Sequence, residues 1–71
     1  MKCYYIITDL ENHVDFMYWQ YPHGDILGAV LGFADKQSTD YDNMRVYPCA
    51  SKKEWKEYYE NNSHRIASIR A

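Results

Sequence analysis

Residues 14–21 have the sequence Val14-Asp15-Phe16-Met17-Tyr18-Trp19-Gln20-Tyr21, which is rich in aromatic and other large apolar side chains. Such side chains fit the pleated surface of a strand better than a helix, so we expect a β-strand here. Successive side chains of a strand point to opposite faces, and in this segment both faces carry large apolar groups. Either a helix covers each face of the sheet, or one face remains exposed as an aromatic patch. The segment alone leaves both alternatives open.

Further strands are predicted on both sides of this segment. Residues 3–10 are rich in β-branched and aromatic side chains, and the polar residues 11–13 connect them to the aromatic segment as a hairpin. Residues 22–24, Pro-His-Gly, end the second strand because proline cannot donate to a β-ladder. Residues 44–49 alternate in character and predict a third strand, with its proline at the end or on an edge. Residues 64–69 fit either a last strand or a frayed helix, and we favour the strand.

A first helix is predicted after the hairpin. Asp25 is a suitable N-cap, and the apolar side chains of residues 26–34 recur at helical spacing. Gly28 and Gly32 fall on one face of this helix, although glycine costs about 1 kcal/mol relative to alanine at such positions. We therefore expect these glycines to allow a close approach between the helix and the sheet.

A second helix has the clearest start signal in the chain. Ser51-Lys52-Lys53-Glu54 matches the capping box, in which the serine and the glutamate each accept a hydrogen bond from the other's backbone N–H. Trp55, Tyr58 and Tyr59 then lie at i, i+3 and i+4 and form one aromatic face.

These elements together predict an α+β protein of order β-β-α-β-α, with a possible last β. A small antiparallel sheet of three to four strands packs with the two helices. The 71 residues provide too little chain for a second domain, so we expect residues 1–71 to be a single domain.

The charge and the composition exclude several classes of function. The formal net charge is −2, and acidic and basic residues are interspersed, which disfavours binding to duplex DNA or anionic lipid. The acidic residues are too sparse for a DNA mimic. No apolar run reaches the roughly 18 residues that cross a bilayer, so we expect no membrane partner. Without a recognisable leader, the two distant cysteines favour reduced thiols and a cytoplasmic location, in the host cell if a phage encodes the chain.

The residues that commonly bind metals or catalyse reactions are scattered along the chain. They are His13, His23, His64, Cys3 and Cys49. No two of them have the short spacing with which one turn presents two zinc ligands, and no nucleophile motif surrounds either cysteine. We therefore expect no metal, no cofactor and no catalytic residue, and we predict that the protein is not an enzyme.

The aromatic residues point instead to binding. The chain has eight Tyr, two Trp and two Phe, which is more than one small core needs, and exposed aromatic side chains are typical of protein-binding hot spots. The candidate partner-binding residues are Tyr18, Trp19, Tyr21, Tyr5, Tyr47, Lys53, Lys56 and Arg45. Further flanking charge is available from Lys2, Arg65 and Arg70. We expect a host protein complex as the partner, with single-stranded nucleic acid as the alternative; a homodimer also remains open.

The start of the chain resembles a group of small proteins encoded by phages and mobile elements, the anti-CRISPR inhibitors. The resemblance lies in the length of the chain, in its pattern of strands and helices, and in the opening segment Met1-Lys2-Cys3-Tyr4-Tyr5-Ile6-Ile7. It implies a non-enzymatic inhibitor that binds and blocks a host defence complex. No functional residue is carried over from it.

Overall fold

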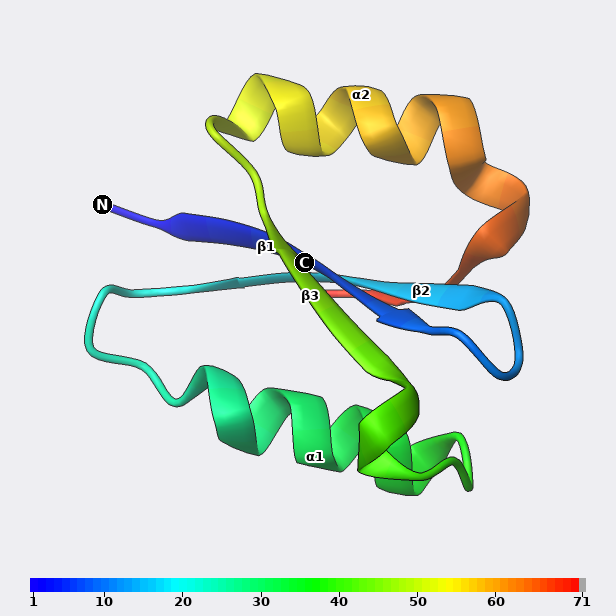
Figure 1. The fold of residues 1–71 in the computed structure, drawn as a ribbon. Helices are drawn as coiled ribbons and strands as arrows, with labels where there is room; N and C mark the ends of the chain where they lie inside the picture. The colour runs from blue at the N-terminus through cyan, green and yellow to red at the C-terminus, as the bar shows by residue number, and fades with distance from the viewer. Residues whose placement is uncertain (71) are drawn as a thin grey trace.

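The computed structural model describes residues 1–70, in which a four-stranded sheet lies between two α-helices (Figure 1). The strands are β1 (Cys3–Asp9), β2 (Val14–Gln20), β3 (Met44–Pro48) and β4 (Ile66–Ile69). The helices are α1 (Ile26–Lys36) and α2 (Lys52–Asn62), with short 3-10 turns η1 (Tyr41–Asn43) and η2 (Ser63–Arg65). The predicted α+β class and order of elements are confirmed, and the last segment is a strand. Neither helix of this part of the chain has the length and apolar character needed to cross a bilayer.

The strand order is β3-β1-β2-β4, and the sheet is mixed rather than fully antiparallel. β1 pairs antiparallel with β2 and β3, whereas β4 pairs parallel with β2. Each helix returns the chain across the sheet, so the strand after it runs in the same direction as the strand before it. The two crossovers move in opposite directions along the sheet. Because such crossovers are right-handed as a rule, they place α1 and α2 on opposite faces.

The aromatic strand β2 contributes to a separate apolar core on each face of the sheet. Phe16 and Tyr18 pack against the cluster under α1, which includes Ile7, Val30 and Phe33. On the other face, the cluster under α2 contains Ile6, Met17 and Trp55, with Tyr4, Trp19, Cys49, Tyr58 and Ile66 packed against it. A helix therefore covers each face of the sheet, which is the first of the two alternatives that the sequence of β2 left open.

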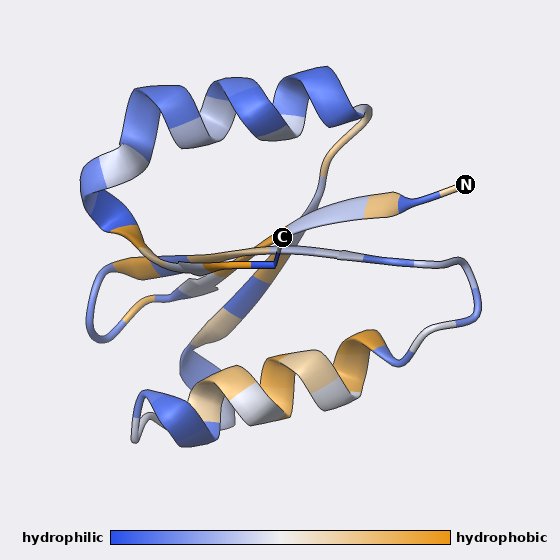
Figure 2. Ribbon diagram, turned by 180° about the vertical axis from the view of Figure 1, so that it is seen from behind, coloured by the Kyte–Doolittle hydropathy of each residue, from blue (hydrophilic) through white to orange (hydrophobic). Residues whose placement is uncertain are grey.

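The outer face of α1 corrects one expectation. Asp25 caps the helix by accepting a hydrogen bond from the Gly28 N–H at 2.9 Å, as predicted. However, Gly28 and Gly32 are exposed and do not contact the sheet, and a Cβ placed on Gly32 would meet no atom within 4 Å. The apolar stripe is wider than one sheet face can cover, so Leu27 and Leu31 are also about half exposed. Figure 2 shows the hydrophobic character along α1 and the hydrophilic character of α2.

The start of α2 follows the predicted capping box in one half only. The Glu54 N–H donates to the Ser51 hydroxyl at 3.2 Å, as expected. The Glu54 carboxylate instead accepts from the Ala50 N–H at 3.4 Å, one residue before the predicted donor. One turn into the helix, Trp55 is buried and its ring N–H donates to the Tyr5 carbonyl at 2.9 Å, which fixes α2 on the sheet.

The turn between β1 and β2 is tied to the end of α1 by a buried carboxylate. Asp9 is fully buried and accepts hydrogen bonds from the backbone N–H groups of Glu11 and Asn12, the Asn12 amide and the Thr39 hydroxyl. Burial alone would raise the pKa of Asp9, but these hydrogen bonds together outweigh it and hold the pKa below the ordinary value. The hairpin and the α1–β3 connection are therefore joined through one charged group.

Candidate binding surface around Trp19

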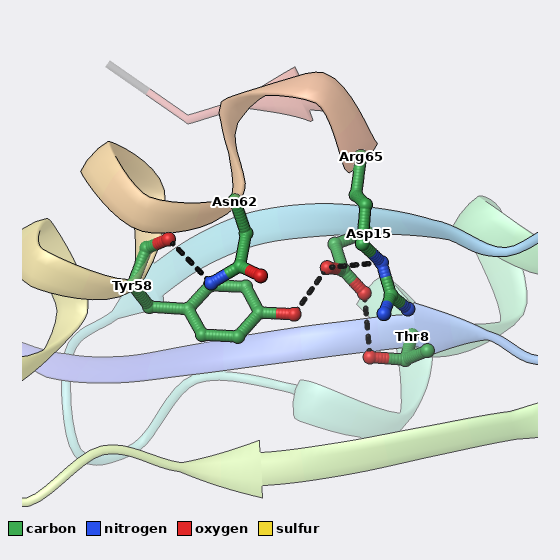
Figure 3. Close-up of polar contacts among 5 residues, drawn as sticks. All are labelled: Thr8, Asp15, Tyr58, Asn62 and Arg65. Carbon is green, nitrogen blue, oxygen red and sulfur yellow. Dashed lines mark hydrogen bonds and ion pairs between the residues drawn. The ribbon is translucent and has the colours of Figure 1, made fainter.

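The most deeply buried polar cluster on the α2 side centres on Asp15 (Figure 3). Asp15 is fully buried in β2 and accepts hydrogen bonds from the hydroxyl groups of Thr8, at 2.7 Å, and Tyr58. The Nε atom of Arg65 in η2 forms an ion pair with it at 3.6 Å. Burial, reinforced by the hydrogen bond to the Asp15 carboxylate, raises the pKa of Tyr58 to about 12.

This cluster is suited to structure rather than to chemistry. Its carboxylate has no exposed surface through which a substrate could reach it. Its partners come from β1, α2 and η2, so it joins the C-terminal part of the chain to the sheet. We assign it a stabilising role.

The two cysteines lie on different faces of the sheet. Cys49 follows β3 and packs in the cluster under α2, whereas Cys3 alternates with Tyr4 and so points to the other face. Both thiols are free. Burial first, then the nearby charge of Glu54, raises the pKa of Cys49 to about 11, which makes it a poor nucleophile at neutral pH. In residues 1–70, no group of three or more His, Cys, Asp or Glu side chains is placed to hold a metal ion.

Aromatic and cationic side chains surround Trp19 at the end of β2, and of these Lys2 and Tyr21 are exposed and Arg70 is half-buried. The Lys2 ammonium and the Arg70 guanidinium each lie 4.1 Å from the centroid of the Trp19 ring. Arg70 is held there by a 2.7 Å hydrogen bond from its Nη1 to the Trp19 carbonyl. Tyr21 lies edge-on to Trp19, with ring centroids 5.4 Å apart, and its side chain is 57% exposed. Lys2 precedes β1 and Arg70 follows β4, so the cluster exists only because the sheet joins both ends of the chain.

A groove extends from this cluster along α2. Its middle is a hollow of about 170 Å³ lined by Lys2, Tyr4, Trp19, Lys52, Trp55, Ile69 and Arg70. A hollow of about 410 Å³ shares Lys2, Tyr4 and Lys52 with it, and a hollow of about 250 Å³ shares Trp55 and Ile69. The three hollows share lining residues and therefore adjoin one another, and we call them together the α2 groove.

Four of the eight candidate contact residues lie at or next to the α2 groove. Trp19 lines its middle, Tyr21 contacts Trp19 and Lys56 lines one end. Tyr5 borders the other end, but its ring lies beside that of Tyr18 on the α1 side of the sheet. Lys2 and Arg70, considered in the sequence as sources of flanking charge, also lie in the groove. Arg65 does not, because it is paired with Asp15.

The other four candidates lie elsewhere. Side chains alternate along β2, so the half-buried Tyr18 faces the α1 side, although the Arg70 guanidinium also lies 5.2 Å from the centroid of its ring. Tyr47 and Arg45 lie on the edge strand β3, where the Arg45 guanidinium donates to the carbonyls of Asp42 and Met44. Lys53 is exposed on α2 but lines none of the three hollows.

Two groove residues that the sequence analysis missed had a usable signal. Lys52 precedes Lys56 by four residues, which places both on one face of a helix. Tyr4 lies directly opposite Trp19 in the hairpin register. The lining by Ile69 had no local signal, because it depends on where β4 joins the sheet.

Comparison with protein families, curated proteins and solved structures finds no match to the chain. We therefore infer a function from the geometry of this surface alone.

Proposed function

We propose that the protein is a non-enzymatic protein-binding module that engages its partner through Trp19, Tyr21 and the adjoining α2 groove. The observation that carries this proposal is the placement of Trp19 beside two cations, with the exposed Tyr21 at its edge. Trp, Tyr and Arg are the residues most often found at binding hot spots. The cation–π contacts and the Arg70 hydrogen bond order these side chains in advance, which reduces the entropy lost on binding.

A host defence complex is the partner that we propose to test first. The resemblance of residues 1–7, and of the chain's length, to small phage inhibitors of the anti-CRISPR type supports this choice. An inhibitor of this kind acts by occupying a surface of the complex, so it requires a contact surface and no catalytic group.

Replacing Tyr21 by Ala is expected to weaken partner binding by about 1 to 2 kcal/mol, the effect of losing a hot-spot side chain. The substitution leaves the fold intact because Tyr21 follows β2 and is more than half exposed. The measurement is capture of host proteins on the immobilised domain, identified by mass spectrometry, followed by titration of the captured partner. Trp19→Ala serves less well, because Trp19 is half-buried and packs in the cluster under α2.

Tyr41→Ala is the matched control. Tyr41 is 46% exposed and lies in η1, next to α1 and on the other side of the sheet. The captured partner should bind this variant as tightly as the unaltered domain. If the Tyr21→Ala variant binds the partner as tightly as the unaltered domain, the surface around Trp19 and Tyr21 is not the binding surface.

Single-stranded nucleic acid is the second candidate ligand, favoured by one observation. Three cations and three aromatic rings line the middle of the α2 groove, a combination found where proteins bind single strands. A filter-binding titration with oligothymidylate at two salt concentrations tests it. Nucleic-acid binding requires an affinity that falls steeply as the salt concentration rises.

A further inference from the structure

The charge of the chain is distributed unevenly over its surface. In the part of the chain that the structure describes, four of the eight Lys and Arg residues line the α2 groove: Lys2, Lys52, Lys56 and Arg70. Only one of the ten Asp and Glu residues, Glu60, lines it. The groove is therefore positive although the whole chain has a net charge of −2.

The groove cations have no carboxylate partner within residues 1–70. The ion pair found in this part of the chain joins Arg65 to Asp15, outside the groove. Lys2 and Arg70 contact the Trp19 ring instead of an acid. A cation–π contact leaves the positive charge intact, so these groups remain available to an anion.

The shape and lining of the groove select the kind of anion. The three adjoining hollows extend from the start of β1 and the β3–α2 connection to the side of α2 rather than forming a single enclosed pocket, which suits an extended chain. Between the cations, the lining is apolar, with Tyr4, Trp55, Tyr59 and Ile69. A ligand that matches both features carries carboxylates with apolar groups between them.

The same contacts disfavour a nucleic-acid strand. A base stacks on the open face of an aromatic ring. Lys2 and Arg70 already lie against the Trp19 ring, and Trp55 is buried with its N–H bound to the Tyr5 carbonyl. A base that stacked on Trp19 would therefore compete with two cations for the ring, and the Trp55 ring is buried.

We infer that the α2 groove binds an extended acidic segment of a partner protein, in which carboxylate side chains alternate with apolar ones. This inference rests on the proposed protein-binding function and names the chemistry of the partner. Electrostatic complementarity of this kind increases the association rate and selects among partners, and the aromatic lining contributes affinity.

The two tryptophans of the chain provide a direct readout, because both line the middle of the groove. The probe is a synthetic dodecapeptide of alternating Glu and Leu, with blocked ends. Its matched control has Gln in place of Glu, and the third ligand is a 12-mer of thymidylate. We expect the Glu peptide to change the tryptophan fluorescence with saturation and the Gln peptide to bind at least about fivefold more weakly. Failure of the Glu peptide to bind, equal binding of both peptides, or tighter binding of thymidylate would overturn the inference.

A pair of neighbouring lysines separates the local from the general effect of charge. Lys52 lines the groove and Lys53 does not, yet Lys52→Glu and Lys53→Glu change the net charge equally. An acid is favourable in the first turn of a helix, so neither substitution should unfold α2. Lys52→Glu is expected to weaken binding of the Glu peptide about fivefold, and Lys53→Glu less than twofold. Equal losses would show that the groove does not hold the peptide.

The peptide assay and the capture assay fail separately. If the peptide does not bind but capture of the partner still depends on Tyr21, the acidic segment is wrong and the protein-binding function stands. If the peptide binds with the expected dependence on Lys52 but capture does not depend on Tyr21, the groove's ligand class stands and the assignment of the Tyr21 surface falls.

Discussion

Replacing Asp15 by Ala is expected to lower the free energy of unfolding by about 3 to 5 kcal/mol, because each hydrogen-bond donor that loses its buried acceptor costs about 1 to 3 kcal/mol. The substitution removes the acceptor of the Thr8 and Tyr58 hydroxyl groups and the partner of Arg65. It also leaves a cavity in a fully buried position. The total free energy of unfolding of a native protein is only about 5 to 15 kcal/mol, so the variant should be marginally folded.

Urea unfolding followed by circular dichroism at pH 7 measures this loss. The control is Asp35→Ala, because Asp35 is an exposed acid on α1 and its loss should change stability by at most about 0.5 kcal/mol. A similar stability for both variants would show that the Asp15 cluster does not hold α2 and η2 on the sheet.

The same cluster has a signature at alkaline pH. The pKa of Tyr58 is raised from 10.0 to about 12, so the folded state keeps the tyrosine proton at a pH where the unfolded chain releases it. The stability that this group contributes is therefore fully present below about pH 10 and is lost as the pH rises towards 12. In a Tyr58→Phe variant, the decrease of stability with pH over this range should be shallower. An unchanged decrease would contradict the hydrogen bond between Tyr58 and Asp15.

Replacing Asp9 by Asn is expected to lower the free energy of unfolding by about 2 to 3 kcal/mol at pH 7. Asparagine keeps the size of the side chain but exchanges one acceptor oxygen for a donor. Glu11, Asn12 and Thr39 all donate their hydrogen bonds to Asp9. The NH2 group of the new amide would therefore face a donor where the carboxylate has an acceptor oxygen. The damage falls on the contact between the β1–β2 turn and the end of α1.

The effect of Asp9→Asn should also depend on pH. The folded state holds the pKa of Asp9 below its ordinary value of 3.8, so the stability due to its charge is present above about pH 4 and is lost as the pH falls. The difference between the unfolding midpoints of the variant and the unaltered protein should therefore be smaller at pH 3 than at pH 7. Asp40→Asn is the control, since Asp40 is exposed and lies near the same turn of chain. A difference between the two midpoints that stays constant with pH would contradict the stabilising role of the charged Asp9 carboxylate.

Local signals in the sequence predicted the elements well. The helix starts at Asp25 and Ser51 depend on side chains that bond backbone groups three residues away, so they are visible in a short window. The apolar groups on both faces of β2 left two alternatives open, a helix over each face or one exposed aromatic face, and in the structure a helix covers each face. The direction of β4 was not accessible in this way, because it follows from two crossovers that span most of the chain.

The candidate site was predicted only in part, for the same physical reason. Trp19 and Tyr21 stood out by composition, but their neighbours Lys2 and Arg70 are brought together only by pairing across the whole sheet. Asp15 did carry a signal, as a charged residue on the same strand face as Met17 and Trp19. Its partner Tyr58 lies 43 residues away and on a different element, which local patterning does not reveal.

Quenching of tryptophan fluorescence by iodide and by caesium tests most directly whether the α2 groove attracts anions. Trp55 is buried, so Trp19 provides most of the fluorescence that a quencher can reach. At a constant ionic strength of about 0.1 M, surface fields still extend about 10 Å. Relative to free N-acetyltryptophanamide, iodide should quench the protein more efficiently than caesium, and Lys52→Glu should reduce this preference more than Lys53→Glu. A preference for caesium, as the net charge of −2 alone would give, would contradict a positive binding groove around Trp19.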